Sequence, residues 1–210
     1  MFSFMKTLFV IVVLLTSQSA LSQEQTPYQV IVGLGDTLFK RLSEEQENLS
    51  SQPELVREII EQNLMPHVDY RYAAYKILGK YIREISKQER EEFALAMRDY
   101  LAVTYVNALS QYKNQKITFQ PETKSNTGKN IAVVKALITE QSVPDIAIDF
   151  SLRFDKKTQQ WKAFDMVIEG ISLINAKQTE ITSRIRASDI QTVTLEIARL
   201  GNQSKLKAKH

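Results

Sequence analysis

The spacing of apolar residues along the chain changes near residue 116. Upstream of that point they recur every three or four positions, which is the period of an amphipathic helix. From Lys116 onward they alternate with polar residues, which is typical of strands that bury one face. Beyond Gly170 the helical spacing returns. The chain is therefore predicted to fold as helices, then a strand meander, then helices.

Three helices are predicted ahead of residue 80, over 28–42, 53–64 and 68–78. Pro53 suits the first position of the second helix, where its missing N–H costs nothing, and Pro66 follows its end. Asp69 is expected to cap the start of the third helix. Gly79 is expected to end that helix or to weaken it.

The clearest helix start is Ser86-Lys87-Gln88-Glu89, a capping-box pattern in which the serine and glutamate side chains each satisfy a free backbone N–H. A long helix is expected to follow. Its inward face is predicted from the three-and-four spacing of Phe93, Ala96, Met97, Tyr100, Leu101, Thr104, Tyr105, Ala108, Leu109 and Tyr112.

Four strands are predicted in the second half of the chain, over 117–119, 131–138, 146–154 and 161–168. The connections between them are short and rich in turn residues, which favours antiparallel pairing. A last helix is expected behind Ser188-Asp189 and to end before Gly201. We predict an α+β fold in which helices pack on one face of a curved, mainly antiparallel sheet, an arrangement that can enclose an apolar pocket.

Residues 1–22 are predicted to be a signal peptide. Lys6 precedes an apolar run over 8–15 that is well short of the ~20 residues needed to span a bilayer, and Ala20 and Ser22 are small residues placed for cleavage. A retained membrane anchor is the alternative. Residues 23–202 are expected to form a single domain. Residues 203–210 are expected to be a basic tail, either simply solvated or attracted to anionic headgroups.

Composition excludes several classes of function. The chain has no cysteine, which removes disulfides, thiolate metal sites and a lipid-modified cysteine. Its 27 basic and 24 acidic residues are scattered and leave a net charge of +3, which does not indicate nucleic-acid binding.

Candidate catalytic groups are sparse. The only histidines are His67 and His210, so His67 with Asp69 is interpreted as a helix start and not as a metal site. Asp165 and Glu169 are four residues apart on a predicted strand, which separates them by about 13 Å, too far for a glycosidase pair. No glycine-rich phosphate loop is found.

Large apolar side chains gather on the predicted strands, at Ile146, Ile148, Phe150, Leu152 and Phe154 and again at Phe164, Met166 and Ile168. Any sheet that packs against helices needs such a face. Periodicity cannot distinguish a filled core from the wall of an open cavity. Both interpretations therefore remain open at this level.

The segment from Trp161 to Ile174, followed by Lys177-Gln178, resembles the MlaC, or toluene-tolerance, family of periplasmic phospholipid-binding proteins. Its pattern is an aromatic residue, an aspartate, an apolar stretch and then Glu-Gly-Ile-Ser. Further matching stretches are Pro27-Tyr28, Leu64-Met65-Pro66, Leu78-Gly79-Lys80-Tyr81, and Phe93 with Tyr100-Leu101 and Tyr105. Lys177 stands where the family often has an arginine, which keeps the charge but loses the planar fork.

The resemblance implies a cystatin-like or NTF2-like fold with a deep apolar pocket for acyl chains. It implies a soluble periplasmic carrier of phospholipid, with no cofactor and no enzymatic activity, that helps to maintain the lipid asymmetry of the outer membrane. The implied partners are an inner-membrane ABC-type lipid transporter complex and an outer-membrane lipoprotein–porin complex. Residues 23–202 would be the lipid-binding domain.

We predict that lipid contacts the strand residues Val134, Ile138, Ile148, Phe150, Leu152, Phe164, Met166 and Ile168 and the helix residues Met97, Leu101, Tyr105 and Leu109. Two alternatives are kept. One is an enzyme of NTF2-like fold in which Asp165 acts as a base on a small apolar substrate. The other is a non-lipid periplasmic adaptor whose core is filled.

Overall fold

A computed structural model describes residues 25–49, 51–113, 115–121, 130–140 and 144–207, with the side chains described up to residue 202. The predicted signal peptide and residues 208–210 lie outside the described residues. The elements, in chain order, are α1 (Pro27–Glu44), α2 (Pro53–Ile59), η1 (Ile60–Leu64), η2 (Met65–His67), α3 (Tyr70–Leu78), η3 (Gly79–Arg83), α4 (Lys87–Leu109), β1 (Lys116–Phe119), β2 (Ile131–Thr139), β3 (Ile146–Asp155), β4 (Gln160–Ile168), β5 (Ile171–Ser172), α5 (Leu173–Ala187) and α6 (Ile190–Lys207).

Local capping interactions fix where several helices start. The capping box at Ser86 is confirmed, because its side chain accepts from the Glu89 N–H while the Glu89 carboxylate accepts from the Ser86 N–H. Asp69 caps α3 as predicted and accepts from the Tyr72 N–H at 3.0 Å. Gly79 ends α3 with a φ of 56°, a conformation that glycine tolerates best.

Two predicted helix ends are wrong. The long helix α4 ends at Leu109 and does not continue to Tyr112. The last helix does not end before Gly201 but continues through it to Lys207, so the expected basic tail begins as helix. A Cβ at Gly201 would lie 2.9 Å from the backbone nitrogen of Tyr100. Gly201 is therefore a point of close approach between α6 and α4, and not a helix terminator.

The described strands form one antiparallel sheet in the order β1-β2-β3-β4-β5, so neighbours in sequence are neighbours in space. The β3–β4 register shifts between Ser151 and Leu152, where Ser151 pairs with Asp165 and Leu152 with Ala163. Phe164 is thus an extra residue, a β-bulge. The bulge puts Ala163, Phe164 and Met166 together in the wall described below.

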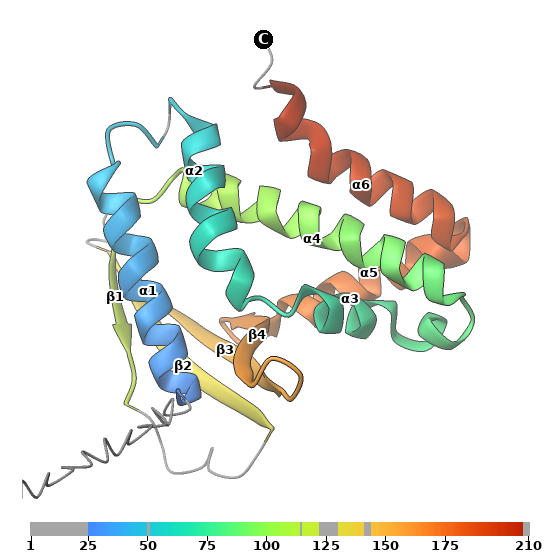
Figure 1. The fold of residues 1–210 in the computed structure, drawn as a ribbon, viewed down its shortest axis with the longest axis horizontal. Helices are drawn as coiled ribbons and strands as arrows, with labels where there is room; N and C mark the ends of the chain where they lie inside the picture. Colours follow the sequence, from blue (N-terminus) through green and yellow to red (C-terminus); the bar gives the residue numbers. More distant parts are fainter. Residues whose placement is uncertain (1–24, 50, 114, 122–129, 141–143, 208–210) are drawn as a thin grey trace, which may run out of the picture.

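α1 packs across part of the sheet, and α3 to α6 form a helical group that contacts β4 through α3 and α5. Within this group α4 and α6 run along each other (Figure 1). The α3–α6 group surrounds fully buried Phe93, and we call this cluster the helical core. A second cluster joins α1, α2 and α4, and a third joins α1 to β2, β3 and β4. The α+β class and the antiparallel sheet are confirmed.

The inward face of α4 is only partly as predicted. Thr104 and Ala108 are exposed, although the three-and-four spacing placed them inward. Ala102 and Val106 are buried instead, against the cluster of α1 and α2. A helix with packed neighbours on more than one side does not have a single buried stripe, which is why the simple periodicity fails here.

In the described part of the chain, none of the helices combines the length and apolar content that a membrane crossing requires.

Candidate functional site

A cavity of about 480 Å³ lies between the sheet and its helical cover. This volume falls within the range of roughly 300–1,000 Å³ that small-molecule sites occupy. The wall is mainly apolar, and α1, α4, α5 and strands β1 to β4 contribute to it. The helices supply Ile31, Leu34, Leu38, Phe39, Met97, Leu101, Tyr105 and Leu173, and the sheet supplies Ile117, Phe119, Ala136, Ile138, Ile148, Phe150, Phe164 and Met166, among others.

Eight of the twelve residues predicted to contact lipid line this cavity, namely Met97, Leu101, Tyr105, Ile138, Ile148, Phe150, Phe164 and Met166. The structure thus brings residues from one helix and three strands to one space. That they contact lipid stays a prediction.

The other four predicted residues do not line the cavity. Val134 and Leu152 are buried in the cluster between α1 and the sheet, where the residues of α1 fill the space above them. Leu109 packs beside the cluster under α2. Ile168 pairs with Ile171 at the end of β4, beyond the cavity wall. The structure therefore does not place these four at the cavity, and whether they contact lipid stays a prediction.

Sequence reasoning missed the contribution of α1 and β1. Ile31 and Leu38 belong to the helical spacing that predicted the first helix, whereas Leu34 does not, and nothing local indicates which surface this helix faces. Gly35 lies between Leu34 and Leu38, and only the structure shows why a glycine stands there. A Cβ there would stand 2.7 Å from the ring of Phe119, so glycine lets this ring pack against α1.

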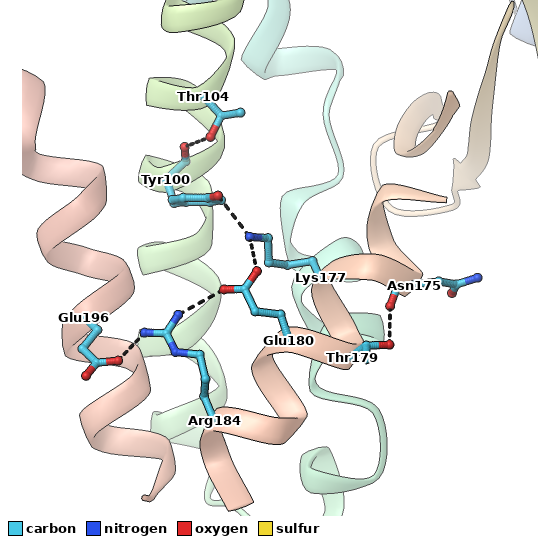
Figure 2. A network of polar contacts seen from close by, with 8 residues as sticks. All are labelled: Tyr100, Thr104, Asn175, Lys177, Thr179, Glu180, Arg184 and Glu196. Atoms are coloured by element: carbon cyan, nitrogen blue, oxygen red, sulfur yellow. Dashed lines mark hydrogen bonds and ion pairs between the residues drawn. The ribbon is translucent and has the colours of Figure 1, made fainter. Parts of the chain in front are cut away.

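A chain of polar contacts borders the cavity where α4, α5 and α6 meet (Figure 2). The Lys177 Nζ donates to the Tyr100 hydroxyl at 3.1 Å and to Glu180 Oε2 at 2.6 Å. Arg184 donates to Glu180 at 3.2 Å and also to Glu196 on α6. The charges alternate along the chain of contacts, so positive and negative side chains compensate each other.

The contact between Lys177 and Glu180 shifts the pKa of both side chains. Burial opposes the charge of Lys177, but its bonds to Glu180 and Tyr100 outweigh burial and raise its pKa. Burial likewise opposes the charge of Glu180, yet Lys177 and Arg184 outweigh it and lower the pKa of Glu180. Both groups are therefore charged at neutral pH, at a cavity edge where Thr104 and Glu180 are exposed.

Asp165, the candidate base, has a structural role. Its carboxylate accepts from the Ser172 hydroxyl at 2.7 Å and from the Ile174 N–H at 3.0 Å, at the start of α5. A carboxylate that satisfies free N–H groups at a helix start stabilises that helix. Within the described ranges, no group of three or more histidine, cysteine or acidic side chains is arranged to hold a metal ion.

Fold and cavity together define a class of protein, an α+β fold that encloses an apolar cavity with a polar edge. The chain belongs to the MlaC protein family, whose sequence profile matches residues 33–199. It is 30% identical over 166 residues to the intermembrane phospholipid transport system binding protein MlaC of Haemophilus influenzae, covering 79% of this chain and 77% of that protein.

Two further proteins are similar. The toluene tolerance protein ttg2D of Pseudomonas putida is 27% identical over 150 residues, 71% of this chain and 68% of that one. The structure of a phospholipid-binding protein from Ralstonia solanacearum, in complex with a phospholipid, has the same fold with a TM-score of 0.74 at 14% identity, covering 85% of this chain and 98% of that chain.

Proposed function

We propose that this protein is a soluble periplasmic carrier that binds a phospholipid with its acyl chains inside the cavity and moves it between the two membranes of the envelope. The observation that carries the proposal is an apolar cavity of about 480 Å³ in a chain of the MlaC family. A filled core, which the adaptor alternative requires, does not agree with this open space. As a family member similar to named binding proteins, the chain is not an enzyme.

The energetics of hydrocarbon transfer suit a carrier. Each methylene removed from water is worth about 0.8 kcal/mol, so acyl chains are strongly held against release into the aqueous space. Against a bilayer the same transfer is close to neutral, because the cavity wall and the membrane interior are both apolar. A modest bias supplied by a membrane complex is then enough to load or unload the cavity.

The polar edge gives the bound lipid an orientation. Lys177, Glu180 and Tyr100 border the cavity beside exposed Thr104, whereas the rest of the wall is mainly apolar. A headgroup placed at this edge stays in contact with water and with the Lys177 ammonium. The acyl chains then extend along α4 toward Leu38 and Phe39 of α1.

The wider setting follows from family membership and from the N-terminal sequence. Removal of residues 1–22 would release the lipid-binding domain, 23–202, into the periplasm. An inner-membrane ABC-type lipid transporter complex and an outer-membrane lipoprotein–porin complex would be its two docking partners. This transport would maintain the lipid asymmetry of the outer membrane. The cavity-enclosing sheet is consistent with the cystatin-like or NTF2-like arrangement expected from the sequence.

Native mass spectrometry of the protein, purified from a Gram-negative periplasm without added lipid, tests the proposal. The expected spectrum contains the protein with a mass added that extraction identifies as phospholipid. Protein without lipid, which also takes none from phospholipid vesicles, would contradict the proposal.

An Asp165→Asn variant addresses the enzyme alternative. The amide keeps an acceptor oxygen for the α5 start but cannot act as a base, so full lipid transfer by this variant is the expected result. Loss of transfer in a variant that still folds and still binds lipid would favour the catalytic alternative.

A further inference from the structure

Among the described residues that line the cavity, one side-chain hydroxyl group makes no hydrogen bond to the protein at all. Among the lining residues with polar side chains, Tyr100 accepts from Lys177, Thr104 donates to the Tyr100 carbonyl, Asp165 accepts from Ser172, and Glu180 accepts from Lys177. Tyr105 is the exception: no hydrogen bond joins its hydroxyl to any residue that the structure describes. A polar group in apolar surroundings without a partner is unfavourable and calls for an explanation.

The hydroxyl of Tyr105 is a permanent donor. Burial in the apolar wall raises its pKa to about 12, and the negative charge of Asp165 acts in the same direction. The proton therefore stays on the oxygen at neutral pH. Asp165 is not itself the partner: its carboxylate accepts from Ser172 and Ile174, and no hydrogen bond joins it to Tyr105.

The position along α4 indicates which part of a bound lipid lies near this donor. Tyr105 is five residues beyond Tyr100, which places its Cα about 7.5 Å further along the helix and away from the charged edge at Lys177. Below the phosphate of a glycerophospholipid, the next polar atoms are the carbonyl oxygens of the acyl esters. They are acceptors only, and beyond them the chains carry no polar atom.

We propose that the Tyr105 hydroxyl donates a hydrogen bond to an ester carbonyl oxygen of the bound lipid, so that the carrier selects ester-linked over ether-linked lipids. This inference rests on the proposed function and adds a specificity to it. An ether-linked lipid offers no carbonyl, and its binding leaves the Tyr105 donor unsatisfied. The same headgroup and chain length on an ether linkage should therefore bind more weakly.

A competition experiment tests the selection. The protein is incubated with vesicles that contain equal amounts of dipalmitoyl phosphatidylethanolamine and its dihexadecyl ether counterpart, and native mass spectrometry measures the ratio of the two complexes. The wild-type protein should load the ester form roughly fivefold over the ether form, the effect of one net hydrogen bond. Tyr105→Phe removes only the hydroxyl and should bring the ratio close to one.

The matched control is Tyr112→Phe. Tyr112 follows α4 and packs its ring on Phe39 at 5.1 Å, but it does not line the cavity, so its variant should keep the wild-type ratio. Equal loading of both lipids by the wild-type protein would overturn the inference while leaving the carrier function intact. An unchanged preference in Tyr105→Phe would also overturn it. Failure to load either lipid would instead contradict the proposed function itself.

Discussion

The two halves of α4 meet different surroundings, although they belong to one continuous helix. Near its start, Phe93 and Ala94 are fully buried against α3, α5 and α6 in the helical core. Further along, Leu101 and Tyr105 face the cavity and remain partly accessible. Apolar side chains of the same helix thus lie in a close-packed core at one end and beside an open cavity at the other. What decides is whether the element opposite supplies side chains to fill the space.

The largest expected effect comes from truncating one phenylalanine in each region. Phe93→Ala should lower the free energy of unfolding by about 3–5 kcal/mol, because it opens a cavity in a close-packed site. Phe150→Ala only enlarges an existing cavity and should cost about 1–2 kcal/mol in the lipid-free protein. Urea denaturation measures both losses. Equal losses would mean that Phe150 is packed as tightly as Phe93.

A pair of tryptophan substitutions separates filling a cavity from overpacking a core. Leu152 is fully buried between α1 and the sheet, so Leu152→Trp should cost about 1–3 kcal/mol. Met166→Trp projects into open space and should cost less than about 1 kcal/mol while abolishing lipid loading. Thermal denaturation and native mass spectrometry give the two readouts. Normal loading by a folded Met166→Trp protein would argue against the cavity as the lipid site.

The smallest expected effect concerns the ion pairs that link α5 to α6 beside the cavity. Glu180 has a lowered pKa, so its contribution to stability is complete above its unfolded pKa of about 4.3 and fades as the pH falls through the lower folded value. Arg184→Met should therefore cost less than about 1 kcal/mol at pH 7, because the Glu180 side chain is 45% exposed.

That cost should shrink below about pH 4 and at high salt. The control is Lys40→Met, which removes a largely exposed pair with Glu44 and should leave stability nearly unchanged. Denaturation curves at pH 7 and pH 3 measure the difference. A loss that is the same at both pH values would show that Arg184 acts through packing of its aliphatic stem and not through its charge.

Features that depend on short stretches of sequence were predictable. The capping box at Ser86, the cap at Asp69 and the break at Gly79 each involve groups within a few residues of one another, so local chemistry determines them. The strands were predictable for the same reason, since alternation is a local property. Gly201 misled the prediction because its small size serves a distant contact with α4.

The candidate site was harder to predict, because its walls depend on which element lies opposite. Phe150 and Leu152 share one face of β3, yet α1 covers Leu152 and leaves Phe150 beside open space. Alternation identifies the shared face but contains no information about the position of α1. For the same reason, Ile31 and Leu38 were detected as a helical stripe and not as cavity wall.

The β-bulge at Phe164 makes the cavity wall sensitive to the number of residues in β4. Before the bulge, Trp161 and Ala163 pack on the side of the sheet that faces α1, and after it the even-numbered Met166 lines the cavity on that side. Loss or gain of one residue here would exchange inside and outside for half of the strand. Exchanging side chains of different size along β4 would therefore change the volume of the cavity, whereas a change in the length of this strand would remove part of its wall.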